Sequence, residues 1–314
     1  MKCTTYQNLK NTTVDLGSGF AMKTKEDWKW SGAEDTGLFT FDNCTKVVIS
    51  GGTIDASGQI WWPAEGEDRV DRPSLIVIKN CREIEVKNLT LINSPFYNFR
   101  LYDSTDIVIH DIKFISPPDS PNTDGVNVEQ GVNRLEVYNC DVQVGDDAFA
   151  VNAFKGPSSN CTFRDSIIRS GHGVSIGSGV YNKITNIKFN NIKFIGTRYI
   201  GRVKCKKPPS AYPRNKGVVE DVTFSNLSGE NIERLPIMVD AEYGDEPNTE
   251  VKCNNIIFND IVCKGSKLSY YLVTPKKNQV EVKLKNITIT GVESTNPTVK
   301  NVTPKISNVT VKKR

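Results

Sequence analysis

One stretch decides the fold: NKITNIKFNNIKFIG, residues 182–196. Apolar and polar residues alternate on both sides of its central asparagine pair, and alternation of period two is typical of β-strands. Segments of similar form, N/D-C/S-x-x-h-x-h-x-N/G-h-x-h with h apolar, occur along the whole chain. They are DNCTKVVISGGTI (42–54), KNCREIEVKNLTL (79–91), YDSTDIVIHDIKF (102–114), NRLEVYNCDVQV (133–144), VVEDVTFSNLSG (218–229), KCNNIIFNDIVC (252–263) and VEVKLKNITITGV (280–292).

The spacing of these segments predicts how they pack. Anchored on the second strand of each copy, they lie about 23 to 36 residues apart, with no convincing amphipathic helix between them. Strand repeats of this length predict a solenoid in which each repeat forms one coil. The anchors are Thr53, Leu89, Ile112, Val142, Ile167, Ile192, Leu227, Ile261 and Ile287. We expect an all-β, right-handed parallel β-helix of roughly ten coils, forming a single domain over residues 1–314.

Two other repeat architectures fit less well. The leucine-rich repeat pattern L-x-x-L-x-L-x-x-N does not occur in the chain. A propeller needs about 40–45 residues per blade, joined by hairpin turns. The Asn-G and Asp-G pairs that favour such hairpins are scarce here.

Composition narrows the range of partners. The 314 residues include 40 Lys and Arg against 36 Asp and Glu, a formal charge of +4 that is dispersed along the chain. Nucleic-acid binding normally requires a clustered basic stripe, so we expect no nucleic-acid partner. No stretch approaches the roughly 18 apolar residues of a membrane span, and the given N-terminus has no apolar signal-peptide core. We therefore expect no membrane partner.

Asparagine is unusually abundant, with 29 residues, and eight of them open N-x-[ST] sequons. These are Asn11, Asn43, Asn88, Asn160, Asn226, Asn286, Asn301 and Asn308. Sequons are acceptor sites in secreted proteins, although a strand protein rich in Asn and Thr also produces them by chance. Their number favours a secreted, extracellular glycoprotein. The eight cysteines are an even number, which permits disulfides without fixing their pairing.

Three polar clusters follow the second strand of three consecutive predicted coils: SPNTDG (120–125), VGDDA (144–148) and SGHGVSIGS (170–178). Their charged residues are 22 and 26 residues apart, about one coil each. Equivalent positions in stacked coils lie about 4.8 Å apart, so these side chains should meet on one face. A fourth cluster, GRVKCKK (201–207), belongs to the next coil. The shared face then carries Asp124, Asp146, Asp147, His172, Arg202 and Lys204.

Each cluster alone has a structural interpretation, as a turn, a solvated loop or a polar strand face. Their common register across four coils favours a reactive site instead. Three close carboxylates raise the pKa of at least one of them, which leaves an acid protonated near neutral or mildly acidic pH. Glycoside hydrolysis uses one protonated acid and one ionised base. Arg202 and Lys204 would bind an anionic substrate. His110 is expected to be structural, at a strand end.

These motifs resemble the signatures of the polygalacturonases, glycoside hydrolase family 28. The matching pieces, in order, are SPNTDG (120–125), GDD (145–147), GHGVSIGS (171–178) and RVK (202–204), and the likeness covers nearly the whole chain. The family is a right-handed parallel β-helix. The resemblance implies hydrolysis of the α-1,4-galacturonosyl linkages of homogalacturonan (pectin) with inversion, without a cofactor or metal.

The resemblance also implies roles for individual residues. Asp146 matches the general acid, Asp124 and Asp147 match the pair that activates water, and His172 matches the assisting histidine. Single displacement with inversion normally places acid and base about 6.5–9.5 Å apart.

Further matches concern the substrate. Arg202 and Lys204 match the residues that hold the galacturonate carboxylate, and Asn122 would line the site. Tyr243, in PIMVDAEYGD, matches a substrate-contacting tyrosine, although its surroundings depart from the family pattern. The G-H-G form at 171–173 favours endo action over exo action.

Four positions depart from the family. Ala148 and Ile168 replace a pair of cysteines, Asn127 stands at an acidic place, and Cys205 stands where Thr is common. These changes motivate one alternative, a weak or inactive relative that binds pectin or an inhibitor protein. A second alternative is a Ca²⁺-dependent β-helix lyase, and a third is a purely structural β-helix such as an adhesin. We expect a monomer that acts on pectin, with a polygalacturonase-inhibiting protein as a further partner.

Overall fold

The computed structural model describes residues 3–18, 30, 32–33, 35–63, 71–210, 212 and 216–314. Within them, short strands form two long sheets, with one 3₁₀ turn, η2 (Gly58–Ile60). The 11-stranded sheet contains, in order, β1 (Thr4–Gln7), β3 (Gly37–Asp42), β6 (Ser74–Lys79), β8 (Phe99–Tyr102), β10 (Val126–Gln130), β13 (Phe149–Ala153), β15 (Val174–Val180), β17 (Tyr199–Lys204), β19 (Leu235–Asp240), β21 (Tyr270–Val273) and β23 (Thr298–Lys300).

The 13-stranded sheet lies against the first. Its main path is β2 (Lys10–Asp15), β4 (Thr45–Ser50), β7 (Arg82–Ile92), β9 (Thr105–Ile115), β11 (Asn133–Tyr138), β14 (Ser158–Ile168), β16 (Lys183–Ile195), β18 (Val218–Glu230), β20 (Lys252–Leu268), β22 (Val280–Ser294) and β24 (Lys305–Lys313). Two short strands extend it: β5 (Thr53–Asp55) pairs with β7, and β12 (Asp141–Gln143) pairs with β9 and β14.

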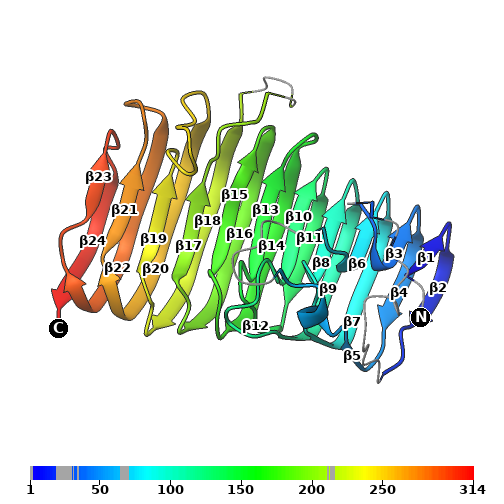
Figure 1. Cartoon of the computed structure of the whole chain (residues 1–314). Helices are drawn as coiled ribbons and strands as arrows, with labels where there is room; N and C mark the ends of the chain where they lie inside the picture. The colour runs from blue at the N-terminus through cyan, green and yellow to red at the C-terminus, as the bar shows by residue number, and fades with distance from the viewer. Residues whose placement is uncertain are drawn as a thin grey trace.

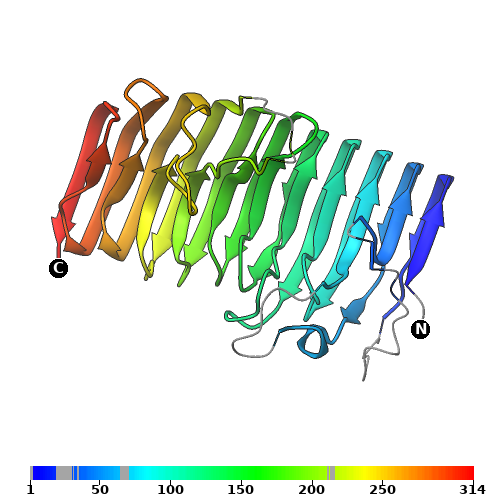
Figure 2. The same ribbon diagram turned by 45° about the horizontal axis from the view of Figure 1, so that its top comes forward.

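The chain passes alternately between the two sheets and returns one strand further along each time (Figures 1 and 2). The register between neighbouring strands of each sheet is parallel throughout, as between β16 and β18 or between β15 and β17. This is a right-handed parallel β-helix, as the sequence predicted. The strands of the first sheet in the described residues agree with the expected number of coils. The single-domain organisation stays a prediction.

Most of the predicted anchors are in register, but three are not. Leu89 pairs with Ile112, and Ile192 pairs with Leu227, which continues to Ile261 and Ile287. Three anchors were wrong by one or two positions. Thr53 pairs with Thr90 and not with Leu89. Val142 pairs with Phe114 and Ile168, and Ile167 pairs with Asp141 and Lys193.

The turns do not shift the register. Ile49 pairs with Val86 before the turn and Thr53 with Thr90 after it, at the same offset, and the pairs Tyr138–His110 and Asp141–Lys113 likewise share one offset. The three anchors lie beside the equivalent position, which in the coil of β14 is Ser166, the partner of Ile192.

Phenylalanines form a continuous stack inside the solenoid. Phe163, Phe189, Phe224 and Phe258 are register partners on successive coils, with ring centroids 5.0, 5.0 and 4.5 Å apart. Phe149, from the facing sheet, extends this stack at 5.2 Å from Phe163. Stacked aromatic pairs of this kind contribute about 0.5–1.5 kcal/mol beyond the area they bury.

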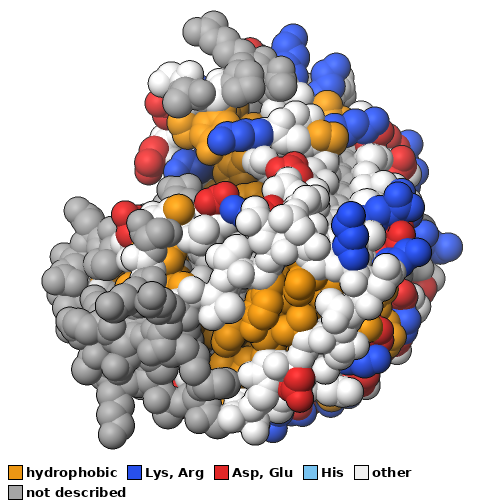
Figure 3. All heavy atoms as spheres, turned by 90° about the vertical axis from the view of Figure 1, so that its right-hand side faces the viewer, with side chains coloured by type: hydrophobic (Ala, Val, Ile, Leu, Met, Phe, Trp, Pro, Cys, Tyr) orange, Lys and Arg blue, Asp and Glu red, His pale blue; other side chains and the backbone are white. Residues whose placement is uncertain are grey.

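The N-terminal end of the solenoid shows apolar side chains at the surface among the described residues (Figure 3).

Asparagine side chains link one coil to the next. Eighteen asparagines among the described residues have a positive φ, the left-handed region that Asn tolerates better than most residues. Their side-chain amides form ladders: Asn186 donates to Asn160, and Asn160 donates to Asn133, each at 2.7 Å. All eight sequon asparagines have this backbone conformation. Six of them donate an amide hydrogen bond to another coil, namely Asn43, Asn160, Asn226, Asn286, Asn301 and Asn308.

The cysteines form no disulfides. All eight are free thiols and seven of them are buried. Burial raises the pKa of Cys140 and Cys161 to about 12, so both are inert core side chains. His110 lies in the middle of β9, not at a strand end as predicted, and its ring stacks on Tyr138 at 4.9 Å. No helix in the described part of the chain has the length and apolarity that a membrane span requires.

Candidate active site

Consecutive strands of the 11-stranded sheet bring the predicted reactive residues together. Asp124 lies two residues before β10, Asp146 and Asp147 lie just before β13, and His172 lies two residues before β15. The strands β10, β13, β15 and β17 are consecutive neighbours in the sheet. Val126 of β10 pairs with Phe149, Phe149 with Val174, and Val174 with Gly201. One side-chain oxygen or nitrogen from each of Asp146, Asp147 and His172 lies within 4.8 Å of the others.

Two glycines explain the G-H-G sequence. Gly171 and Gly173 have φ values of +84° and +80°, a backbone conformation that residues with a side chain rarely adopt. A Cβ on Gly171 would come within 2.3 Å of the Asp146 carbonyl oxygen, and one on Gly173 within 2.3 Å of the Tyr199 carbonyl oxygen. The His172 amide donates to the same Asp146 carbonyl at 2.8 Å. The glycines therefore allow the His172 turn to lie directly on the neighbouring coils.

Asp147 is the most heavily bonded carboxylate of the site. Its Oδ1 accepts from Arg202 Nη2 and from Ser175 Oγ at 2.9 Å, and its Oδ2 accepts from Lys204 Nζ at 3.0 Å. Burial alone would raise the pKa of Asp147, but the charges of Arg202 and Lys204 outweigh it and hold the pKa well below its usual range. Asp147 is therefore ionised in the folded protein.

Asp124 has the opposite environment. It is 6% exposed, and its buried Oδ1 has no hydrogen-bond partner. Burial, followed by the negative charges of Asp146 and Asp147, raises the pKa of Asp124 well above its usual range. Of the two buried carboxyls, Asp124 therefore holds its proton more strongly, as expected where like charges share a site.

Asp146 is the accessible carboxyl, with its side chain 22% exposed against 4% for Asp147. Its Oδ1 lies 2.7 Å from His172 Nδ1, and its Oδ2 accepts from Asn122 Nδ2 at 3.3 Å. Asn122, in a turn with φ of 53°, accepts in turn from Arg72 Nη2 at 3.0 Å. Asp146 is thus held from two sides and faces solvent.

Arg202 and Lys204 are less accessible than a substrate-binding pair would be. They are 3% and 7% exposed, because both bond to Asp147 beneath aromatic rings. The Arg202 guanidinium lies 4.5 Å from the ring centroid of Tyr199, and the Lys204 ammonium lies 5.4 Å from that of Tyr243. Tyr243 is therefore beside the site, as expected from the sequence. Their direct contact with substrate stays a prediction.

Sequence reasoning missed two residues of this site, Arg198 and Tyr199. Arg198 Nη1 donates to His172 Nε2 at 2.7 Å, and Tyr199 covers Arg202. A signal was available: the coil length that joins Val174 to Gly201 places Arg198 beside Gly171, where its amide donates at 2.8 Å. Neither residue belongs to the four motifs that marked the site.

The departures from the family pattern leave the carboxylates in place. Asn127 is buried and donates to Glu129 Oε2 at 2.7 Å, while its own oxygen accepts from Asn152 at 3.0 Å. Ala148 and Ile168 are fully buried apolar residues, so no polar group is orphaned where the family has two cysteines.

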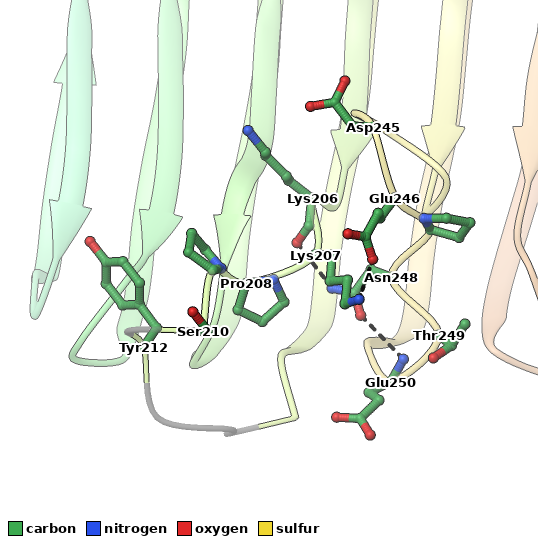
Figure 4. Close-up of a pocket in the computed structure, with 12 residues that line it drawn as sticks. Lys206, Lys207, Pro208, Ser210, Tyr212, Asp245, Glu246, Asn248, Thr249 and Glu250 are labelled. Carbon is green, nitrogen blue, oxygen red and sulfur yellow. Dashed lines mark hydrogen bonds and ion pairs between the residues drawn. The ribbon is translucent and has the colours of Figure 1, made fainter.

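A separate pocket of about 690 Å³ lies between the loops that follow β17 and β19 (Figure 4). Lys207 forms an ion pair with Glu246 across it, and Asn248 donates to the Lys206 carbonyl at 3.1 Å. Its lining has three acidic side chains and two lysines, and none of the residues of the candidate site. This charge balance does not suit a polyanion.

The chain as a whole has relatives among known proteins. The sequence model of glycosyl hydrolases family 28 matches residues 3–310. The chain belongs to this family. Its family 28 relatives include a probable polygalacturonase of Arabidopsis thaliana, 28% identical over 77% of this chain and 52% of the relative. An endo-polygalacturonase of Pectobacterium carotovorum is 29% identical over 88% of this chain and 69% of the relative.

The family 28 fold is matched by solved structures as well. A polygalacturonase from Erwinia carotovora superimposes with a TM-score of 0.73 and 26% identity, covering 88% of this chain and 73% of the other. The chain spans about half the length of the Arabidopsis relative and about two thirds of the Pectobacterium relative.

Proposed function

We propose that this family 28 protein is a polygalacturonase, which hydrolyses α-1,4-galacturonosyl linkages of homogalacturonan. The observation that supports this most directly is the contrast between three neighbouring carboxyls. Asp147 is held ionised by two cations, the pKa of Asp124 is raised by burial and by the neighbouring carboxylates, and Asp146 faces solvent beside His172. Environments that separate the protonation states of adjacent carboxyls are what acid–base catalysis requires.

In the proposed reaction Asp146 protonates the glycosidic oxygen, because it is the carboxyl that a polymer can reach. A water bound against Asp124 and Asp147 attacks C1. Asp147, being ionised, accepts the proton of that water, and Asp124 provides an O–H group that orients it. The leaving sugar departs with the proton from Asp146, and the new hydroxyl comes from water.

The bonding of Asp147 suits the binding of a water molecule as the nucleophile. Its Oδ1 already accepts two hydrogen bonds, from Arg202 and Ser175, while Oδ2 accepts one from Lys204 and keeps a lone pair that can accept from the water. Attack by water predicts inversion. The distance between the carboxyls favours retention instead. An oxygen of Asp146 lies within 4.8 Å of an oxygen of Asp147, whereas inverting enzymes usually separate the two carboxyls by roughly 6.5–9.5 Å. Proton NMR of the first-formed anomer distinguishes inversion from retention at C1. We expect inversion, which gives β-galacturonate from the α-linked polymer.

The deciding experiment uses polygalacturonic acid at mildly acidic pH, with and without chelator. Reducing ends and ultraviolet absorbance are followed together, for the unchanged protein and for Asp146→Asn. Asp141→Asn is a matched control, because Asp141 is an exposed carboxylate of the same coil that pairs with Arg169. We expect reducing ends without absorbance, lost in Asp146→Asn and kept in Asp141→Asn.

Other outcomes would overturn the proposal. Absorbance that vanishes with chelator would indicate a lyase; a cation held by Asp146, Asp147 and His172 would have to compete with Arg202 and Lys204 for Asp147. A folded protein that binds the polymer but forms no product would indicate an inactive relative.

We further propose endo action, supported by the G-H-G turn and by the endo-polygalacturonase relative. Endo action predicts a mixture of oligomers early in the reaction, whereas exo action releases short products from the start. Secretion, a monomeric state and binding of a polygalacturonase-inhibiting protein stay predictions.

A further inference from the structure

Both ring nitrogens of His172 have a partner. Nδ1 lies 2.7 Å from Asp146 Oδ1, and Nε2 lies 2.7 Å from Arg198 Nη1. A guanidinium group only donates hydrogen bonds, so Nε2 must be the acceptor and carries no proton. The remaining ring proton is then on Nδ1, which donates it to Asp146. The contacts therefore select one neutral tautomer of His172, since a doubly protonated ring could not accept from Arg198.

Backbone contacts place Arg198 for this role. Its amide donates to the Gly171 carbonyl at 2.8 Å, and its carbonyl accepts from the Arg234 amide at 3.1 Å. Its side chain is 48% exposed, and its Nε lies 3.6 Å from a Glu233 carboxylate that is 58% exposed. Such an exposed ion pair contributes little, so the neighbouring coils rather than Glu233 fix the position of Arg198.

Asp146 has a similar arrangement on its other side. Asn122 Nδ2 donates to Oδ2 at 3.3 Å, and Arg72 Nη2 donates to the Asn122 carbonyl oxygen at 3.0 Å. The guanidinium on the oxygen of the amide fixes which end of Asn122 faces Asp146. Asp146 thus receives one N–H from each side, and each donor is oriented by an arginine behind it.

We propose that Arg198 is a positioning residue that fixes His172 as the neutral Nδ1–H tautomer and so determines which oxygen of Asp146 carries the catalytic proton. Oδ1 accepts the short bond from His172, so the acid proton belongs on Oδ2. A protonated Oδ2 keeps a lone pair for the longer contact with Asn122. This inference rests on the proposed function for its catalytic meaning, but the tautomer itself is a property of the resting protein.

Nitrogen-15 NMR of histidine tests the tautomer directly. The chain has only two histidines, and His172→Gln assigns their signals. We expect the unchanged protein to show His172 protonated on Nδ1 alone. Arg198→Met should abolish this form in favour of the Nε2–H tautomer or the doubly protonated ring. His110 is an internal reference, because both its nitrogens face carboxylates, Asp111 at 2.6 Å and Glu85 at 3.1 Å, and its signals should not change.

Kinetics on polygalacturonic acid separate positioning from substrate binding. We expect Arg198→Met to lower kcat roughly tenfold, less than the hundredfold or more expected on losing a general acid, with a shifted pH profile and little change in KM. Arg198→Lys keeps a cationic donor and should recover part of kcat. Arg169→Met, which removes an exposed arginine bound to Asp141, is the matched control and should change neither spectrum nor rate.

Two results would overturn the inference. One is a His172 ring that is doubly protonated or protonated on Nε2 in the unchanged protein. The other is an unaltered spectrum in Arg198→Met with only KM raised, which would make Arg198 a substrate contact. If the protein proved inactive while the NMR result held, the proposed function would fail and the assignment of the tautomer would stand.

Discussion

At the scale of single residues, two adjacent carboxyls respond to burial in opposite directions. Asp147 and Asp124 are both almost fully buried, but Arg202 and Lys204 bond to Asp147, whereas an oxygen of Asp124 bonds to nothing. The first is therefore stabilised as an anion and the second is destabilised as one. Their pKa values move apart, and the stability of the fold must depend on pH through both.

Substituting Asp124 tests how its raised pKa makes the stability of the fold depend on pH. Because the pKa of Asp124 is raised in the folded protein, the stability it contributes is full below its unfolded pKa of about 3.9 and is lost as pH rises through the folded pKa. Asp124→Asn cannot ionise. We expect its Tm to match that of the unchanged protein near pH 3.5 and to exceed it by a few °C, roughly 1–2 kcal/mol, at pH 7. A Tm difference independent of pH would contradict this, and calorimetry measures it.

Substituting Asp147 should have the opposite sign. Its depressed pKa stabilises the fold above about pH 3.9 and ceases to do so as pH falls through the folded pKa. Asp147→Asn leaves Arg202 and Lys204 as buried charges without a carboxylate. We expect a loss of about 3–5 kcal/mol at pH 7, measured by denaturant unfolding, and a smaller loss in acid. An equal loss at all pH values would mean that packing, not charge, is responsible.

The sequence predicted that Asp124, Asp146, Asp147 and His172 lie together, because their separations are close to one coil. It could not predict that Arg202 and Lys204 are buried beneath Tyr199 and Tyr243, since the alternation of a strand does not show which side chains fold over one another, and Tyr243 comes from the loop of another coil. Arg198 was missed for a related reason: an exposed arginine outside a motif has no pattern to distinguish it until the register is known.

At the scale of elements, asparagines with a positive φ account for the many sequons. Six of the eight sequon asparagines, Asn11, Asn88, Asn160, Asn226, Asn286 and Asn308, lie inside strands at a residue with left-handed backbone. This conformation favours Asn and the surrounding strand favours Thr, so N-x-T arises where the two meet. The amides of six sequon asparagines already bond to a neighbouring coil. The sequons are therefore weaker evidence for secretion than their number indicated, and secretion stays a prediction.

Two substitutions of Asn160 separate its backbone role from its ladder bonds. Asn160 has φ of 55°, donates to Asn133 and accepts from Asn186. Asn160→Gly and Asn160→Ala both remove the amide, but only Ala is strained at this φ. We expect Ala to be less stable than Gly by about 1 kcal/mol, with Gly itself below the unchanged protein. Equal thermal stability of the two variants would show that the backbone conformation is unimportant there.

At the scale of the whole molecule, stability is distributed along the axis of the solenoid. Each strand pairs only with its neighbours in the sheet, and the phenylalanine stack runs through successive coils from Phe163 to Phe258. Period-two alternation was sufficient to predict this architecture. The register errors at Thr53, Val142 and Ile167 arose because alternation does not specify which residue of one strand pairs with which residue of the next. In the coil of β14, for example, the partner of Ile192 is the polar Ser166, and the apolar Ile167 beside it was taken instead.

Removing one ring from the stack should act locally. Phe224→Ala leaves a cavity between Phe189 and Phe258 and should destabilise the protein by about 3–5 kcal/mol. Hydrogen exchange followed by mass spectrometry should show faster exchange in β16, β18 and β20, with β4 and β7 unchanged. Phe224→Leu, which fills part of the space, is the milder control. Uniformly faster exchange along the chain would mean that the solenoid unfolds as one unit.

The ladder of parallel coils has a consequence for how such a protein can change its dimensions. The candidate active site occupies the coils of β10, β13, β15 and β17, and every other coil is joined to its neighbours by the same parallel backbone pairing. Adding or deleting a complete coil outside those four shifts one flank by about 4.8 Å and leaves the reacting groups where they were. Half a coil would instead move every following strand into the opposite sheet. The length of the surface that a polymer can contact therefore changes only in steps of one complete coil.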